Sequence, residues 1–300
     1  MNSIVFFDLE INPDNRQICD VGAIRSDGST FHENSIPRLL DFMRNEDFIC
    51  GHNVFKHDLQ YIQQTTGNVS FGLQNSIDTL FLSPLLFPSY PYHRLLKVDK
   101  LAKDEQNNPL NDAKKAMDLF YDEIAAFGSL AESIKTIYYN LLNGQKEFAC
   151  FFSYLNYADP LSAQELESLI WTSFENKICQ GANLSKFIAS NPVALAYCLS
   201  LINVSDRYSI TPPWVLHTFP DVDRLMFLLR NNPCVTGCSY CDEALDPVKA
   251  LVRYFGHPSF RSYDGKPLQD QAVRAAVNNK SLLAVFPTGG GKSVCFQVPA

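Results

Sequence analysis

The first 128 residues alternate between two patterns of hydrophobic positions. Short stretches rich in β-branched and aromatic residues predict strands, and they lie at 3–11, 17–28, 29–33 and 48–53. The polar segment 12–15, Asn-Pro-Asp-Asn, predicts a turn between the first two strands. Apolar residues at helical spacing follow over 37–45, 55–67 and 109–128.

The helix predicted at 109–128 has end signals of its own. Asn108 suits the N-cap, Pro109 the first helical position, and Gly128 the C-terminal stop. Strands and helices that alternate in this way predict an α/β domain over 1–128, which is an ordinary domain size.

The rest of the chain divides into three further parts. Helical spacing dominates 129–230, which predicts a helical accessory or bridging region. Residues 231–250 hold a cluster of cysteines, and 251–300 contain an apolar stretch, 281–286, that runs into a glycine-rich turn. We expect that apolar stretch to be a strand.

Composition narrows the class of protein. An apolar fraction of 46% fits globular domains, and no stretch approaches the roughly 18 apolar residues of a membrane span. Nine cysteines without a secretory signal predict reduced thiols or metal ligands rather than disulfides, and hence a cytoplasmic protein. The net charge is −7, yet 251–300 holds six basic and two acidic residues, the sign expected of a nucleic-acid surface.

Acidic residues gather at three places in the first domain. Asp8 and Glu10 lie two apart on a predicted strand, so their side chains project to the same face. Two acids close together on a buried strand repel each other and lose hydration, which is unfavourable unless a cation lies between them. Asp58 near the start of one predicted helix and Asp112 in the first turns of another offer further carboxylates.

These acids occur in the order of a known family. The first domain resembles the DnaQ-like, or DEDD, 3′-to-5′ exonucleases of the RNase H-like fold, which has a central mixed sheet. Three motifs carry the resemblance, and they appear here as Phe7, Asp8 and Glu10, as His52, Asn53 and Asp58, and as Asp112 with Ala113.

The resemblance implies two-metal phosphodiester hydrolysis. Asp8 would bridge two Mg²⁺ or Mn²⁺ ions, and Glu10, Asp58 and Asp112 would complete the ligand set.

The sequence departs from the family at the catalytic base. The family has a His five residues before the last Asp or a Tyr four residues before it, and this chain has Asn107 and Asn108 at these two positions. Neither amide can act as a titrating base. His93 is a candidate for a substitute base, and a catalytically weak or inactive module that binds nucleic-acid ends is the alternative function.

The cysteines of the third part have metal-ligand spacing. Cys234, Cys238 and Cys241 follow a C-x3-C-x2-C pattern, which favours a bound metal over free thiols. The candidates for a fourth ligand are Cys179, Cys198 and His217. Structural Zn²⁺ and a structural [4Fe-4S] cluster both remain open, whereas the position between two domains argues against the cluster of radical SAM enzymes.

The glycine-rich turn predicts a phosphate site. Its backbone amides can wrap phosphate oxygens, Lys292 supplies a positive charge and Ser293 a ligand for Mg²⁺. Residues 251–300 resemble the opening of RecQ-like superfamily 2 helicases, and the resemblance assigns ATP binding to Phe260, Arg261, Gln269, Thr288, Gly289, Gly290, Gly291, Lys292 and Ser293.

The four parts together resemble a bacterial RecQ-family helicase with an N-terminal DnaQ-like exonuclease. The expected function is 3′-to-5′ degradation of DNA, single-stranded or at 3′ ends, in repair or replication, by a nucleoid-associated protein. Cleavage of RNA stays open, because nothing in the sequence reads a 2′-hydroxyl. We expect no ATP hydrolysis from 251–300 alone, because the acidic box and arginine finger of a helicase are not among these residues.

Overall fold

A computed structural model describes residues 2–68, 72, 74–95, 108–204, 210–235 and 237–299. The N-terminal part is built on a five-stranded sheet in the order β3-β2-β1-β4-β5. The strands are β1 (Ile4–Ile11), β2 (Ile18–Arg25), β3 (Thr30–His32), β4 (Phe48–Gly51) and β5 (Ser76–Asp78). β2 is antiparallel to β1 and β3, whereas β4 is parallel to β1 and β5. The predicted α/β class with a mixed sheet is confirmed.

Alternate residues of β1 enter two different hydrophobic cores. Val5, Phe7 and Leu9 are buried with helices α1 (Ile36–Met43) and α2 (Asp58–Thr66) on one face of the sheet. Ile4 and Phe6 are buried on the opposite face with the long helix α4 (Pro109–Ser129). This alternation follows from the two-residue period of a strand. Even-numbered residues of β1 up to Glu10 therefore face α4, and odd-numbered residues face α1 and α2.

Helix α4 begins as predicted but ends differently. The Asn108 side chain accepts hydrogen bonds from the backbone N–H groups of Leu110 and Asn111, and Pro109 is the first helical residue. Gly128 was expected to stop the helix, which is wrong, because α4 continues to Ser129 and ends where Leu130 becomes extended. Gly128 lacks the positive φ of a glycine stop.

The described part of 129–230 is mostly helical, and it shares a core with the sheet. It comprises α5 (Glu132–Leu142), α6 (Ala149–Leu155), α7 (Ala163–Ser173), α8 (Leu184–Ser190), α9 (Pro192–Asn203), α10 (Pro213–Thr218), α11 (Asp221–Met226) and the single π-helical turn η2 (Phe227–Asn231). Helix α9 packs on α3 (Thr79–Leu86), where the Tyr197 hydroxyl donates to the Phe81 carbonyl at 2.8 Å. One continuous hydrophobic core therefore runs from β1 through α4 into these helices.

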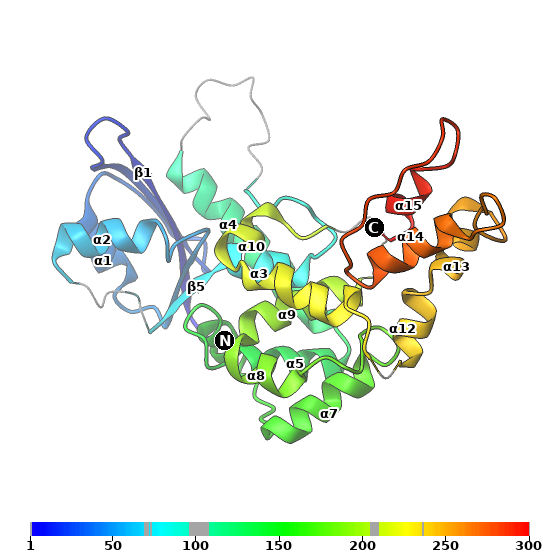
Figure 1. Ribbon diagram of the computed structural model, residues 1–300. Coiled ribbons are helices and arrows are strands. Elements are labelled where there is room, and N and C mark those ends of the chain that lie inside the picture. The colour runs from blue at the N-terminus through cyan, green and yellow to red at the C-terminus, as the bar shows by residue number, and fades with distance from the viewer. Residues whose placement is uncertain are drawn as a thin grey trace.

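The C-terminal part has a small core of its own. It contains α12 (Ser239–Ala244), α13 (Pro247–Ala250), the π-helical turn η3 (Leu251–Phe255), α14 (Leu268–Val277) and α15 (Val294–Gln297), and it lies on the side opposite the sheet (Figure 1). The strand expected at 281–286 is wrong: these residues are irregular, and Leu283 and Val285 are 90% and 80% exposed. A strand needs a hydrogen-bonded neighbour, and the described residues provide none here.

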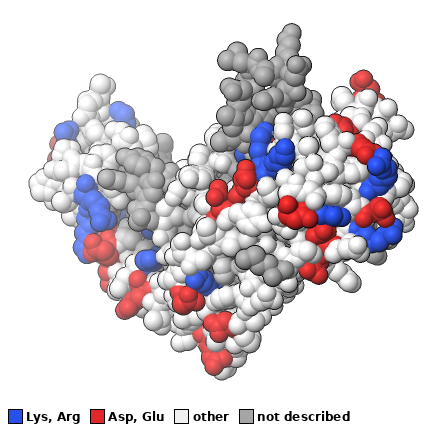
Figure 2. Space-filling model, turned by 180° about the vertical axis from the view of Figure 1, so that it is seen from behind, with Lys and Arg blue, Asp and Glu red and all other residues white. Residues whose placement is uncertain are grey.

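Charge is mixed on the surface. Lysine and arginine side chains lie among aspartate and glutamate on the face shown in Figure 2, and no broad basic area stands out among the residues coloured there. Over the described parts of the chain, no helix is both long and apolar enough to cross a membrane.

A buried carboxyl on α4 gives a test of this packing. Glu123 is fully buried between Phe120 and Phe127 of the helix stripe, and neither of its oxygens has a hydrogen-bond partner among the described residues. Burial, with the negative charge of Asp78, raises the pKa of Glu123 well above its usual value. The unfolded chain therefore loses this proton at lower pH than the native protein, and native stability decreases as pH rises above about 4.3.

We expect Glu123→Gln to flatten the pH dependence of stability. Between pH 5 and 8, the free energy of unfolding should decrease less steeply in the variant than in the unchanged protein. The two slopes should differ by up to about 1.4 kcal/mol per pH unit. Urea unfolding at several pH values measures this. Asp122→Asn, an exposed acid on the same helix, should keep the original slope. Equal slopes for Glu123→Gln and the unchanged protein would show that Glu123 does not stay protonated in the core.

Candidate functional site

Three of the four predicted acids meet at one end of β1. Asp8 and Glu10 have the same parity along the strand as Ile4 and Phe6, so they lie on the face covered by α4. Asp112 stands in the first turn of that helix. Carboxylate oxygens of Asp8, Glu10 and Asp112 all lie within 4.8 Å of one another, and the three residues are half-buried.

A glycine that sequence reasoning missed brings α4 this close to the sheet. Gly22 of β2 pairs directly with Asp8, and a Cβ added to Gly22 would lie 2.0 Å from the backbone nitrogen of Leu110. Any larger residue would push the first turn of α4, and with it Asp112, away from Asp8. The pairing of Gly22 with Asp8 depends on the strand register, which cannot be read from the sequence, so the sequence could not identify Gly22 as the contact point for α4.

The three carboxylates fit a hard divalent cation. Oxygen donors that leave room for water suit Mg²⁺ or Mn²⁺, and their mutual repulsion is relieved when a cation binds. Lys115 offsets part of this charge, since its Nζ lies 2.9 Å from a carboxylate oxygen of Asp112. The donor set is therefore consistent with the predicted magnesium or manganese site.

Asp58, the fourth predicted acid, lies beside this group. Its side chain is buried at the start of α2, and Oδ1 accepts a hydrogen bond of 3.0 Å from the backbone N–H of Leu9. Burial raises the pKa of Asp58, and the nearby His57 acts in the opposite direction. Asp58 thus contacts β1 between Asp8 and Glu10 without belonging to the group of three within 4.8 Å.

His52 and Asn53 of the second motif line a cavity of about 510 Å³ between the sheet and the helical region, and Asp58 does not. His52 Nδ1 lies 2.9 Å from the Thr79 hydroxyl, and burial lowers the pKa of His52 to about 4 although Asp112 acts to raise it. The other lining residues are Leu80, Pro91, Tyr92, His93, Arg94, Leu95, Pro212, Pro213 and Trp214.

The proposed bases have different outcomes. His93 is buried, its Nδ1 lies 2.8 Å from the Ser83 hydroxyl, and burial lowers its pKa to about 4. His93 lines the same cavity as His52, and its lowered pKa leaves the ring neutral at pH 7. Asn107 lies outside the described residues, and Asn108 is occupied as the helix cap. The role of His93 as a base stays a prediction.

Four of the C-terminal residues expected to bind ATP, Arg261, Gln269, Gly289 and Gly291, are joined by hydrogen bonds. The buried Gln269 accepts from the backbone N–H of Arg261 at 2.9 Å and donates through Nε2 to the Gly291 carbonyl at 3.0 Å. Lys292 donates to the carbonyls of Phe286 and Pro287, both at 3.2 Å. Phe260 packs against the small C-terminal core, and Thr288 and Ser293 are exposed. Sequence reasoning missed Tyr263, whose hydroxyl donates to the Gly290 carbonyl.

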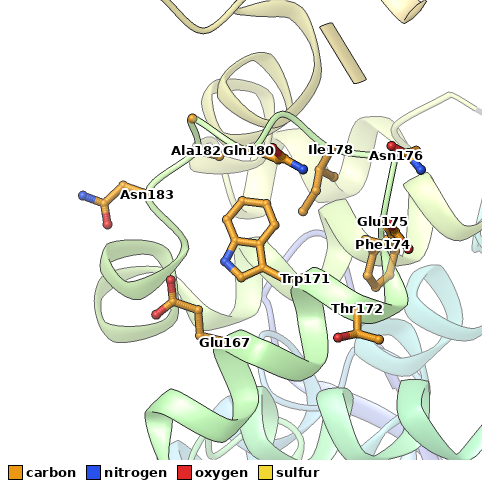
Figure 3. A pocket seen from close by; sticks show the side chains of 11 residues that line it. Glu167, Trp171, Thr172, Phe174, Glu175, Asn176, Ile178, Gln180, Ala182 and Asn183 are labelled. Carbon is orange, nitrogen blue, oxygen red and sulfur yellow. The ribbon is translucent and has the colours of Figure 1, made fainter. Parts of the chain in front are cut away.

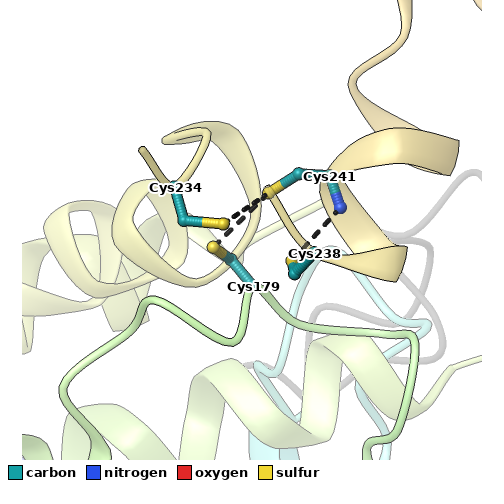
Figure 4. A group of neighbouring side chains, drawn as sticks. All are labelled: Cys179, Cys234, Cys238 and Cys241. Carbon is teal, nitrogen blue, oxygen red and sulfur yellow. Dashed lines mark hydrogen bonds between the residues drawn. The ribbon is translucent and has the colours of Figure 1, made fainter. Parts of the chain in front are cut away.

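The cysteine cluster contains one of the three candidates for the fourth ligand. Cys179, which lies between α7 and α8, joins Cys234, Cys238 and Cys241, and the four sulfur atoms lie within 4.8 Å of one another (Figure 4). Cys198 is buried elsewhere and donates to the Val222 carbonyl, and His217 does not belong to the group. The loop between α7 and α8, which carries Cys179, also lines a pocket of about 890 Å³. The Trp171 side chain of α7 lies below residues 176–183 in this pocket (Figure 3).

Comparison with known proteins relates a short stretch of the chain to RecQ-type DNA helicases. The ATP-dependent DNA helicase RecQ of Bacillus subtilis is 45% identical over 51 residues, which is 17% of this chain and 8% of that protein. The ATP-dependent DNA helicase Q1 of Rattus norvegicus is 39% identical over 54 residues, 18% of this chain and 9% of that protein. The ATP-dependent helicase SGS1 of Saccharomyces cerevisiae is 43% identical over 54 residues, 18% of this chain and 4% of that protein.

The chain spans less than a tenth of the length of these relatives. No protein-family model matches the chain, and no solved structure matches it. The similarity is therefore limited to a short stretch that this chain shares with RecQ-type DNA helicases.

Substitution of Gly22 tests the geometry of the acidic group. We expect Gly22→Ala to lower Mn²⁺ affinity about 10–100-fold, the range typical of residues that position metal ligands, because α4 must move away from Asp8. Isothermal titration with Mn²⁺ measures the affinity, and circular dichroism checks that the variant is folded.

Gly128→Ala is the matched control, because no atom lies within 4 Å of its added Cβ. It should leave Mn²⁺ affinity unchanged and stabilise α4 by about 0.5–1 kcal/mol. A folded Gly22→Ala variant with unchanged affinity would contradict the role given to Gly22.

Proposed function

We propose that the N-terminal domain is a metal-dependent 3′-to-5′ exonuclease of the RNase H-like fold that acts on DNA. The observation that carries the proposal is the convergence of Asp8, Glu10 and Asp112 within 4.8 Å, from segments about a hundred residues apart. The motif resemblance gives these same positions as metal ligands. The mixed sheet agrees with the fold that the resemblance implies.

The residues of the site divide the work. Asp8, Glu10 and Asp112 would hold the ions, and Asp58, fixed by the N–H of Leu9, would add a carboxylate on the other side of β1. Two bound divalent ions stabilise the charge that develops on the attacking and leaving oxygens of a phosphodiester. Lys115 reduces the repulsion between the acids when ions are absent.

The cavity beside His52 supports binding of a nucleic-acid end. Its volume of about 510 Å³ lies within the range of ligand pockets, and it is lined by Trp214 and Tyr92, aromatic rings on which a base can stack. Arg94 at the same cavity offers a planar cation suited to phosphate. Binding in this cavity would bring the terminal phosphodiester to His52 and Asn53 of the second motif.

We also propose that 251–300 is the first segment of an ATP-dependent RecQ-like DNA helicase. The matched stretch is about as long as this segment, and the bonds of Gln269 join the expected adenine side of the site to the phosphate loop. The combined protein would act in DNA repair or replication.

A binding module without catalysis is the second candidate. It is favoured by Asn108, whose side-chain oxygen is already bonded to the N–H groups of Leu110 and Asn111, so that the family's tyrosine position offers no proton acceptor. Such a module would hold DNA ends in the same cavity and position the helicase segment.

Asp8→Asn distinguishes the two candidates. With Mn²⁺ and 5′-labelled single-stranded DNA, the unchanged protein should shorten the labelled strand stepwise from its 3′ end. Asp8→Asn should reduce the rate more than the roughly 10–100-fold caused by loss of an outer-shell partner. Asp41→Asn, an exposed acid of α1, should retain full activity.

Two outcomes contradict the exonuclease. Equal shortening by Asp8→Asn would show that the activity belongs to another site or another protein. Tight binding of DNA ends without any shortening, in both Mg²⁺ and Mn²⁺, would favour the binding module.

A further inference from the structure

Four cysteine sulfurs from separate parts of the chain converge outside the acidic site. Cys241 Sγ lies 3.4 Å from Cys179 Sγ and 3.8 Å from Cys234 Sγ, and all four sulfurs lie within 4.8 Å of one another. A disulfide requires about 2.05 Å, so these sulfurs are not bonded in pairs. Cys179 is 55 positions before Cys234, which means that folding rather than local sequence brings it here.

The spacing distinguishes a single ion from a cluster. Tetrahedral zinc with Zn–S bonds of about 2.3 Å holds its sulfurs about 3.8 Å apart, close to the distances observed. In a four-iron cluster each thiolate binds a different iron, which requires wider separation of the sulfurs. A donor set of four thiolates also selects zinc over the hard cations expected at the acidic group.

The backbone around the sulfurs is arranged for thiolate ligands. The N–H of Gly181 donates to Cys179 Sγ at 3.4 Å, and the N–H of Cys241 donates to Cys238 Sγ at 3.5 Å. Gly181 also permits the two segments to meet, because a Cβ there would lie 2.6 Å from Cys234 Cβ. Gly237, with φ of 73°, makes the turn between Cys234 and Cys238.

The junction around these cysteines has almost no other core. Its buried residues are Cys179, Cys238, Cys241 and Tyr240, with Cys234 and Leu245 packed against them. A core of this composition buries little apolar area, so hydrophobic packing contributes little to its stability. The Ser239 hydroxyl donates to Asn176 Oδ1 and so joins residues 231–250 to the loop that carries Cys179.

We infer that Cys179, Cys234, Cys238 and Cys241 bind one structural zinc ion, which fixes residues 231–250 to the helical region. Cys179 belongs to the loop between α7 and α8, whereas the other three precede α13 and the segment that carries the glycine-rich turn. The ion thereby determines where the C-terminal segment begins relative to the exonuclease-like domain. This inference does not depend on the proposed nuclease activity.

Metal analysis of the full chain tests the inference. After dialysis against Mg²⁺, the unchanged protein should contain about one zinc per chain by mass spectrometry, and Co²⁺ substitution should give the absorption of tetrahedral cobalt thiolate. Cys179→Ser should bind zinc at least 10-fold more weakly. Cys198→Ser, a buried cysteine outside the group, and Cys19→Ser, an exposed one, should both retain full zinc.

Limited proteolysis provides a readout that does not depend on a variant. Chelation of zinc from the unchanged protein should open residues 231–250 to cleavage, and added zinc should restore protection. Iron and sulfide in the protein, four free thiols without zinc, or full zinc content in Cys179→Ser would each overturn the inference. A junction equally resistant with and without zinc would overturn the structural role. Loss of nuclease activity alone would leave these results unchanged.

Discussion

Close contact between the first turn of α4 and Gly22 of β2 is the constraint on which the acidic group depends. Because Gly22 lacks a side chain, the helix lies against the sheet directly opposite Asp8. Asn108 and Pro109 then begin the helix at a fixed residue, so that Asp112 falls in its first turn. The alternation of β1 completes the arrangement, since Asp8 and Glu10 share the face of Ile4 and Phe6.

The helices that follow α4 stabilise this contact by packing against α4. The apolar stripe of α4 is buried in the same core as α5, α6 and α9, and α9 holds α3 through hydrogen bonds to the carbonyls of Phe81 and Leu85. Helix α3 carries Thr79, which positions His52, so the cavity also depends on this packing. Glu123 is the exception in the otherwise apolar buried stripe of α4, and the free-energy cost of burying it rises with pH.

Much of the first domain follows from local patterns in the sequence. The strands at 4–11 and 18–25 and the helix that begins at Pro109 were predicted, because side-chain alternation and capping are local. Strand β5 and helix α3 were missed, because β5 has only three residues and α3 contains Pro84, so neither shows a clear pattern in the sequence. The strand expected at 281–286 failed because pairing, not propensity, makes a strand.

The acids of the site could be named from sequence, whereas their supports could not. Gly22 and the choice of Cys179 over Cys198 depend on register and on contacts across more than fifty residues, which no local pattern records. The most direct test of the account is the position of Mn²⁺ found by anomalous scattering from crystals of the protein. The account predicts manganese bonded to carboxylate oxygens of Asp8, Glu10 and Asp112, and manganese bound elsewhere with this group empty would contradict it.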